Sequence, residues 1–573
     1  MLRADRDGIA LLIVMLLTMV VAAIAAGAAL IGANSFLINQ YDQKASLLES
    51  VADAGLELGR ARLNANPALY SDSSVATLEY DAAVYDAEGN VIPGVTRTVH
   101  SMPLGGGLGE YGNFAALVAT AEDAEGTRAI RRLDLIQESF AVYAYFTDVE
   151  PSDIYFGNND QLYGPVHSNS NIKISSTGAT FHGPVTTAGV FEGADYATFL
   201  DDTTSGVTPI LLPTSGQITS LQDRAAPAHL SFTAAGGGNV GQSTLRLHFI
   251  ARDVDGDGAE EGFVRVYRSS NPAWVTANVQ DSLAATPNCG HTEADGTFHT
   301  VASDTFPTHD ANTILTSATR RCYLGGADEL LATAETPADS AFLANDGRGA
   351  WDAYPGTVHS SLSGQKDASY LFPLDRTMNP AYRGVIFVDG KVVVSGTVRG
   401  RLTLAATGSI IIGDDLVYNT DPGGGACADM LGLFSGDSVV VANNTINAPR
   451  IAPGTSTYYT YDDTRDEYIH ASILALKQFA VQQPWAGATT AEPCNGMPWG
   501  RGCLAITGGL IQDTRGIVSY SNGTGNIKAY THDTCAFTAP PPYFPSTGHF
   551  WRGRYYEVDP TGFDIAHYYD ALN

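Results

Sequence analysis

The stretch IALLIVMLLTMVVAAIAAGAALIGA, residues 9–33, contains no charged side chain. As an α-helix it would be about 37 Å long, enough to cross a hydrocarbon core of about 30 Å. A cleaved secretory signal has an apolar core of only about 7–15 residues, so this stretch predicts a membrane-spanning helix. Arg3 and Arg6 favour a cytoplasmic N-terminus, weakly because Asp5 and Asp7 lie beside them. We therefore expect the rest of the chain outside the cytoplasm.

The helix is expected to continue beyond the membrane, because residues 34–63 contain no proline. One apolar stripe recurs there at the three- and four-residue steps of an amphipathic helix, and it is formed by Leu47, Val51, Ala54 and Leu58. A single helix over residues 9–63 is thus apolar all round in its first half and amphipathic in its second. By itself this pattern predicts a single-pass anchor with a helical stalk.

The composition of the 573 residues favours a β-rich extracytoplasmic protein. There are 60 glycines, 27 tyrosines and 22 phenylalanines, and only 16% of residues are charged, against about 25% on average. The formal net charge of −29 argues against nucleic acid as a partner. The hydrophobic fraction of 44% is enough for large cores, which argues against wholesale disorder.

The fold class expected is mainly β with one long N-terminal α-helix. Residues 64–140 predict a small β unit, because the short β-compatible segments Ala76–Tyr85, Ala115–Ala121 and Ala129–Gln137 are separated by turn-rich stretches. The helix and this unit would form an α/β stem.

The distal part of the chain predicts a head of parallel β-solenoid type, with a twisted β-sandwich as the alternative. The triplet GPV begins at Gly164 and again at Gly183, a spacing that suits one coil with each GPV opening a short strand. Residues 384–418, GVIFVDGKVVVSGTVRGRLTLAATGSIIIGDDLVY, alternate β-branched strands with glycines suited to corners. We place a first solenoid part at 141–204, an inserted subdomain at 205–375, and the main solenoid with the C-terminal tail at 376–573.

An acidic loop, RDVDGDGAEEGF at residues 252–263, is the strongest candidate for a metal site. Carboxylates at alternate positions of a glycine-containing loop suit a hard cation such as Ca²⁺. An EF-hand loop beginning at Asp253 would need glutamate at its twelfth position, where Val264 stands, so this is not an EF-hand. The candidate calcium ligands are Asp253, Asp255, Asp257 and Glu261; the alternative is a solvated acidic turn without metal.

All six cysteines follow the apolar helix, and their even number predicts three disulfides in an oxidising compartment. Six cysteines allow 15 connectivities, so sequence alone does not choose among them. Proximity along the chain favours Cys289–Cys322 and Cys494–Cys503, which leaves Cys427–Cys535. There is no CxxC or zinc-type Cys–His spacing.

No sequence pattern predicts catalysis. His167 in GPVHSNSN and His182 in FHGPV could suggest a catalytic patch on successive coils, but a polar ladder explains them as well. The sequence contains no GxSxG, HExxH or GxxxxGK[ST] motif. We therefore do not expect an enzyme, and a membrane-anchored glycan-active enzyme is the least favoured alternative.

The N-terminal region resembles type IV pilin-like proteins, in particular PilX-type minor pilins and large pseudopilins of type II secretion. A short leader, residues 1–8, ends in Gly8; an uninterrupted apolar helix follows, and then the element Ala52-Asp53-Ala54-Gly55-Leu56, which is similar to AEAGL. The resemblance implies cleavage by prepilin peptidase between Gly8 and Ile9, N-methylation, and packing of the helix into a filament core.

The chain departs from the pilin pattern at one position. Major pilins carry glutamate at the fifth mature residue, where it pairs with the N-terminal amine of a neighbouring subunit; here that residue is Ile13. A subunit at the filament tip has no neighbour ahead of it and needs no such pair. Ile13 and the large head therefore point to a tip or priming subunit.

Several distal blocks also resemble an uncharacterised family of large pilin-like bacterial proteins, which has no known activity. The blocks are GPVHSN at Gly164–Asn169, the glycine-punctuated stretch Gly384–Gly400, GLIQDTRG at Gly509–Gly516 and PPYFP at Pro541–Pro545.

Together these patterns predict a non-enzymatic minor subunit of a type IV pilus or secretion pseudopilus. It would sit in the bacterial inner membrane as a single-pass protein and then pass to the periplasm or to a cell-surface filament. Its partners would be other pilins or pseudopilins, prepilin peptidase, and a surface or host ligand of the head. The alternative is a single-pass anchored adhesin without a filament.

Overall fold

The structure is a computed structural model. It describes residues 5–66, 69–71, 74–104, 114–157, 160–234, 241–270, 272, 275, 290–292, 298–300, 350–365, 368–422, 427–442, 466–485, 494, 502–520 and 523–572. The chain divides into two compact units: unit 1 is Met1–Gly107, Asn113–Gln137 and His549–Asn573, and unit 2 is Leu108–Gly112 and Glu138–Gly548. The protein is mainly β with one long N-terminal helix, which confirms the coarse prediction.

Unit 1 is built on a five-stranded sheet in the order β1-β2-β3-β4-β31. The strands are β1 (Ala76–Tyr85), β2 (Val91–Leu104), β3 (Phe114–Asp123), β4 (Arg128–Ser139) and β31 (Ser546–Val558). The pairs β1–β2, β2–β3 and β3–β4 are antiparallel. Three of these strands lie where the sequence predicts them. Strand β2 was not predicted, since Pro93 and Gly94 give its first residues the appearance of a turn.

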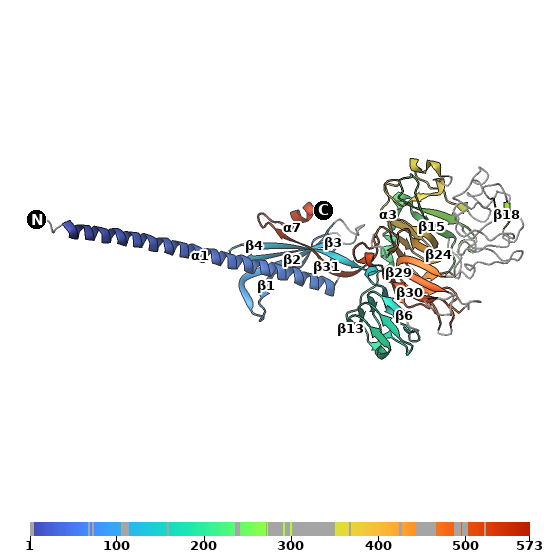
Figure 1. The fold of residues 1–573 in the computed structure, drawn as a ribbon, viewed down its shortest axis with the longest axis horizontal. Helices are drawn as coiled ribbons and strands as arrows, with labels where there is room; N and C mark the ends of the chain where they lie inside the picture. The colour runs from blue at the N-terminus through green and yellow to red at the C-terminus, as the bar shows by residue number, and fades with distance from the viewer. Residues whose placement is uncertain are drawn as a thin grey trace. The chain divides into compact units, whose positions relative to one another are not determined.

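Helix α1 (Asp5–Ala65) packs only its second half on this sheet (Figure 1). The buried residues of that half are Leu48, Val51, Ala52, Leu56 and Leu63. The predicted stripe was wrong except at Val51: Leu47 is 37% exposed, Ala54 is exposed and Leu58 is half-buried. The stripe was predicted from hydrophobic residues alone, whereas two of the residues that face the sheet are glycines, which a hydrophobic pattern does not include.

Those glycines, Gly55 and Gly59, let the helix approach the sheet closely. A Cβ atom on Gly55 would lie 2.7 Å from Arg97 Cδ and 3.1 Å from Ala119 Cβ. A Cβ atom on Gly59 would lie 3.0 Å from Val99 Cγ1. The AEAGL-like element therefore has a local packing role in addition to the resemblance it carries.

The opposite face of the sheet is covered by α7 (Ile565–Leu572). Along β3, side chains alternate between the two faces, so Ala115, Leu117 and Ala119 pack with α1, while Ala116 and Val118 pack with the α7 side. Residues His549–Asn573 thus belong to unit 1, so the prediction that the distal β region extends over 376–573 is wrong at its C-terminal end. No local sequence pattern predicts that the C-terminal residues belong to unit 1, because this depends on the pairing of β31 with β4.

Unit 2 contains a long ladder of parallel strands. Its order is β14-β21-β23-β25-β27-β29-β5-β7-β10-β13, and each neighbouring pair is parallel. The strands are β14 (Ser231–Thr233), β21 (Val385–Asp389), β23 (Arg401–Ala406), β25 (Met430–Ser435), β27 (Glu467–Ala475), β29 (Cys503–Thr514), β5 (Tyr145–Val149), β7 (Val166–Ser168), β10 (Val185–Thr187) and β13 (Thr203–Ser205). The two GPV triplets open β7 and β10, which pair in register at Val166↔Val185, as predicted.

Further parallel ladders lie in the same unit. One runs β15-β22-β24-β26-β28, and another runs β29-β30-β6-β9-β12. Their strands are β15 (Leu245–Arg252), β22 (Val392–Val398), β24 (Ile410–Tyr418), β26 (Val439–Val441), β28 (Phe479–Val481), β30 (Ile527–Thr531), β6 (Asp160–Tyr163), β9 (Ala179–Phe181) and β12 (Ala197–Phe199). A short pair, β8 (Ile172–Lys173) and β11 (Phe191–Glu192), is also parallel. Inward-facing Val, Ile, Leu and Phe side chains from these strands form one large core.

The region 205–375 is not a separate insertion where the structure describes it. Strand β14 pairs with β21, and β15 pairs with β22, so the segment continues the same ladders. Strand β16 (Glu261–Arg268) forms an antiparallel hairpin with β15 and also pairs with β19 (Ala350–Trp351) and β20 (Phe372–Pro373). An antiparallel pair, β17 (Gly290–Thr292) and β18 (Phe298–Thr300), stands apart from the ladders.

The remaining described helices are short. They are η2 (Phe140–Val142), η3 (Ala194–Tyr196), α2 (Ser215–Thr219), α3 (Gln222–Ala225), η4 (Ala226–Ala228), η6 (Ser360–Gly364), η7 (Ala368–Tyr370) and η9 (Thr534–Phe537).

Candidate functional site

The first half of α1 is a surface made almost entirely of apolar side chains. Ile9 is 60% exposed, Ile13 is 56% exposed and Ile38 is 58% exposed, and the large side chains between them are exposed on every side of the helix. The helix is long and apolar enough to cross a membrane, and none of its most apolar window is buried by the residues that the structure describes. The processing candidates Gly8 and Ile9 lie inside α1. Leaving one of these side chains exposed to water costs about 1.5–3 kcal/mol. We therefore expect lipid or apolar side chains of another molecule to cover this surface.

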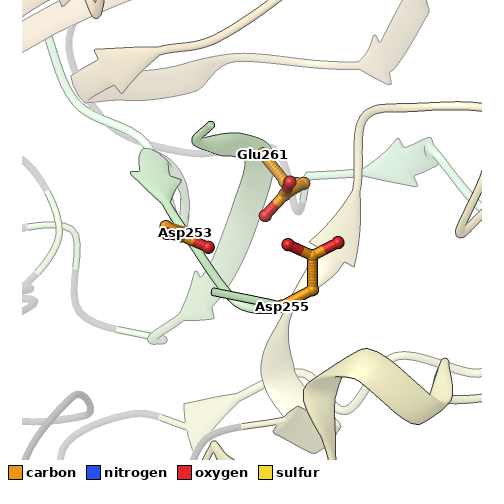
Figure 2. Close-up of side chains that lie close together, drawn as sticks. All are labelled: Asp253, Asp255 and Glu261. Atoms are coloured by element: carbon orange, nitrogen blue, oxygen red, sulfur yellow. The ribbon is translucent and has the colours of Figure 1, made fainter. Parts of the chain in front are cut away.

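The acidic loop lies at the turn of the β15–β16 hairpin, where Arg252 pairs with Glu261. Oxygen atoms of Asp253, Asp255 and Glu261 all lie within 4.8 Å of one another (Figure 2). Asp257 does not belong to this group. The structure thus brings together three of the four predicted ligands.

Electrostatic repulsion in this group is visible at Glu261. Burial raises the pKa of the Glu261 carboxyl, and the charges of Asp255, Asp257 and Asp253 raise it further, against the lowering effect of the Val254 N–H bond. A hard divalent cation would relieve this repulsion.

Backbone groups of the loop also use these carboxylates. Asp253 accepts bonds from the N–H groups of Gly256 (2.7 Å) and Gly258 (3.0 Å), and Asp257 accepts one from Ala259 (2.7 Å). Because such bonds stabilise a turn without an ion, the geometry agrees with either interpretation, and calcium stays a prediction.

The histidines have structural partners. His167 lies 1% exposed in β7; its Nδ1 is 2.7 Å from Thr186 Oγ1 on β10, and its Nε2 is 2.9 Å from Asn169 Oδ1. Its ring stacks on Phe146 at 5.1 Å. His182 instead bonds Gln161 and stacks on Tyr163 at 4.0 Å. These contacts match the polar-ladder interpretation.

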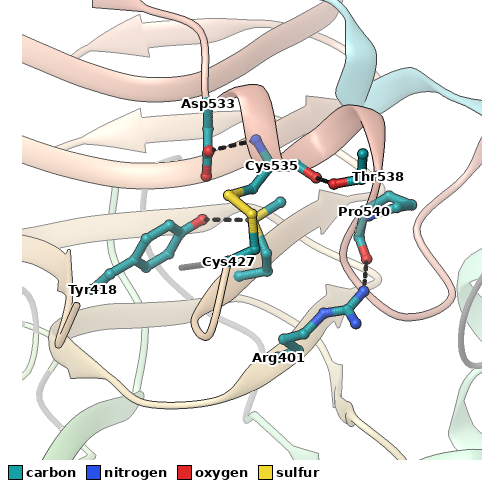
Figure 3. The surroundings of a disulfide bond; sticks show 8 residues. Arg401, Tyr418, Cys427, Asp533, Cys535, Thr538 and Pro540 are labelled. Carbon is teal, nitrogen blue, oxygen red and sulfur yellow. Dashed lines mark hydrogen bonds between the residues drawn. A yellow bond between two sulfur atoms is a disulfide. The ribbon is translucent and has the colours of Figure 1, made fainter. Parts of the chain in front are cut away.

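Two predicted disulfides are present, Cys427–Cys535 and Cys494–Cys503. The first links residues 108 positions apart (Figure 3). Around it, the Asp533 carboxylate accepts a bond from the Cys535 N–H (2.9 Å), and Arg401 donates to the Pro540 carbonyl (2.7 Å). Cys289 and Cys322 lie outside the described residues. Disulfides indicate an oxidising compartment, which agrees with exposure outside the cytoplasm.

Comparison with known proteins gives a partial match to a family model. Residues 111–190 match the model of a family described as a domain of unknown function, DUF4900. No curated protein and no solved structure is significantly similar to the chain. The matched segment covers β3 and β4 of unit 1 and β5 to β10 of unit 2, and it includes the GPVHSN element.

Proposed function

We propose that the protein is a non-enzymatic minor subunit of a type IV pilus or pseudopilus. The observation that carries this proposal is the division of α1: its first half is apolar and exposed all round, and its second half packs on the unit 1 sheet. In pilin-like proteins the helix is divided in the same way. Its first half leaves the membrane and packs against the same helices of neighbouring subunits, while its second half packs on the globular domain. Apolar packing would then drive assembly in either environment.

Ile13 supports a place at the tip or a role in priming. With isoleucine at the fifth mature position, the chain has no carboxylate to pair with the amine of a subunit ahead of it. The parallel ladders support a β-solenoid head in unit 2, because runs of parallel strands in chain order, β21-β23-β25-β27-β29 and β5-β7-β10-β13, are what successive coils produce. Such a large head favours few copies, displayed for assembly or adhesion.

The decisive experiment is the intact mass of the chain after co-expression with prepilin peptidase. Loss of residues 1–8 together with one methyl group on Ile9 is the expected result. A Gly8→Leu variant, which removes the small residue before the cleavage site, should keep its full mass, whereas Gly32→Ala, in the same helix, should be processed normally. A chain that still begins with Met1 after exposure to active peptidase would overturn the proposal and favour the simple anchored adhesin.

The position in the filament has its own test. Labelled subunits should appear at filament ends and in low number. Labels spread along the shaft would contradict the tip assignment while leaving filament membership intact.

Calcium binding by the acidic loop is a separate proposal. We expect added Ca²⁺ to raise the melting temperature of the full chain and Asp255→Ala to abolish that rise. Asp201→Ala, at an exposed acidic position elsewhere in unit 2, is the matched control. An unchanged melting temperature would leave the loop as a solvated turn.

A further inference from the structure

Unit 2 contains a groove of about 370 Å³ that no sequence pattern predicts. It lies beside the junction at which β29 pairs with β5 and β30 pairs with β6. Its walls come from three separate parts of the chain: residues 153–155, 157 and 160; residues 175 and 177; and residues 515–520, 527 and 528. The groove therefore exists only because the two parts of the ladder meet there.

The floor of the groove is charged but internally neutralised. Arg515 forms an ion pair with Glu150 (3.1 Å), and Lys528 forms one with Asp160 (3.3 Å). The Arg515 guanidinium also lies 3.9 Å above the centre of the Phe156 ring. Because each of these cations already has a carboxylate partner, the groove offers no unbalanced positive charge to an anionic ligand. An apolar ligand is also disfavoured, because it would remove water from these charged groups without replacing its hydrogen bonds.

The rim combines exposed aromatic rings with hydroxyl groups. Tyr155 is 48% exposed and Tyr520 is 38% exposed. Ser175, Thr177 and Ser519 supply hydroxyls to the same groove. Such a rim suits a ligand that has both apolar faces and many groups able to donate and accept hydrogen bonds.

A buried phenol adds an independent indication of a ligand. Tyr530 is 8% exposed, and within the described part of the chain its hydroxyl has no hydrogen-bond partner. It lines a cavity of about 20 Å³ that shares Asp160, Arg515 and Lys528 with the groove. That volume holds about one water molecule or one ligand hydroxyl. Leaving a buried hydroxyl without a partner is unfavourable, so a water molecule or a ligand hydroxyl placed in this cavity would stabilise it.

We propose that this groove binds a neutral oligosaccharide. Sugar rings carry C–H faces that pack on aromatic side chains, and their hydroxyls both donate and accept. The tyrosines at the rim would hold the ring faces, the serine and threonine hydroxyls and Asp153 would bind ring hydroxyls, and one sugar hydroxyl or a bridging water would reach Tyr530. The inference goes beyond the filament proposal, because every residue involved belongs to unit 2.

The test is calorimetric titration of the full chain with neutral hexasaccharides of glucose, mannose, galactose and N-acetylglucosamine. The detergent must contain no sugar, so an amine oxide replaces the glucosides and maltosides. At least one hexasaccharide should bind, and Tyr155→Ala and Tyr520→Ala should each weaken binding by about tenfold. Tyr196→Ala, at a 54% exposed tyrosine of unit 2 outside the groove, is the control and should bind as the wild type does.

Two results would overturn the proposal: no member of the panel binds, or the groove variants bind as tightly as the Tyr196→Ala control. Far-ultraviolet circular dichroism and the melting temperature establish that each variant is folded. Because the titration does not depend on cleavage at Gly8, its failure is distinguishable from failure of the filament proposal.

Discussion

Units 1 and 2 are both β-rich, but their strands find their partners in different ways. In unit 1, β1, β2 and β3 each pair with the next strand along the chain, and only β31, which pairs with β4, comes from far away. In unit 2, β29 lies between β27 and β5, so Leu510 pairs with Tyr145 across most of the unit. Unit 1 is therefore organised mainly by local hairpins, whereas unit 2 depends on contacts that form only when the whole unit is folded.

Glycines in the two units differ in which atoms surround them. Gly55 of α1 faces side-chain atoms, which can shift. Gly508 of β29 has φ +148°, and a Cβ atom there would lie 1.9 Å from the Ala471 carbonyl oxygen on β27. Backbone in a stacked ladder cannot shift without disturbing its neighbours, so unit 2 should be less tolerant of added atoms than unit 1.

The largest effect is expected at the junction of unit 2. Arg515→Met removes the partner of Glu150, whose side chain is 1% exposed, and an unpaired buried charge costs about 3–5 kcal/mol of unfolding free energy. Chemical denaturation of the full chain, followed by hydrogen exchange in β5 and β29, measures this loss. The double variant Arg515→Met with Glu150→Gln should recover part of it. A loss below about 1 kcal/mol would show that the junction does not depend on this pair.

A somewhat smaller effect is expected from Gly508→Ala. The added methyl group must displace the Ala471 carbonyl in the ladder, at a cost of about 2–3 kcal/mol. Gly216→Ala in α2, where the nearest atom to a new Cβ is Thr214 Oγ1 at 3.7 Å, is the matched control and should change stability little. Equal melting temperatures for the two variants would contradict the rigidity assigned to unit 2.

In unit 1, Gly55→Ala should cost less, about 1 kcal/mol. Steric overlap with Arg97 and Ala119 costs about 1–3 kcal/mol, and the higher helix propensity of alanine offsets about 1 kcal/mol of that. Gly32→Ala, with no atom within 4 Å, should gain helix stability instead. Hydrogen exchange of α1 residues 48–63 measures the difference. Faster exchange in both variants would mean that close approach to the sheet is not what Gly55 provides.

An effect that depends on pH is expected at Asp415 of β24. Burial and the neighbouring charges of Asp414 and Asp466 raise the pKa of the Asp415 carboxyl to about 7. Because the folded state then binds the proton more tightly than the unfolded state, this group's contribution to stability is complete below about pH 4 and is lost as the pH rises to about 7.

Asp415→Asn should therefore gain about 1–2 kcal/mol relative to the wild type at pH 8 and nothing at pH 3.5. Thermal melting at the two values measures it, with Asp513→Asn of β29 as the control, since Asp513 is also half-buried. A gain of the same size at both pH values would exclude titration of Asp415 as the cause.

The amino-acid sequence alone determined the features that depend on neighbouring residues. The apolar run 9–33 required a long helix, the GPV spacing placed β7 and β10 in register, and chain proximity selected the Cys494–Cys503 disulfide. Alternating Asp253 and Asp255 in a turn predicted that carboxylates would converge, and Glu261 joins them across the hairpin. Each of these follows from periodicity or short spacing, which local physics controls.

Tertiary structure alone decided the features that join distant segments. The glycine-containing face of α1 became visible only against the sheet, and the C-terminal residues His549–Asn573 returned to unit 1 through the β4–β31 pairing. The junction of β29 with β5, and with it the groove around Arg515 and Tyr530, has no trace in any local pattern. The physical reason is that strand pairing between segments hundreds of residues apart is a property of the packed chain. Hydrophobic periodicity indicates only which side chains are buried, not which strand covers them.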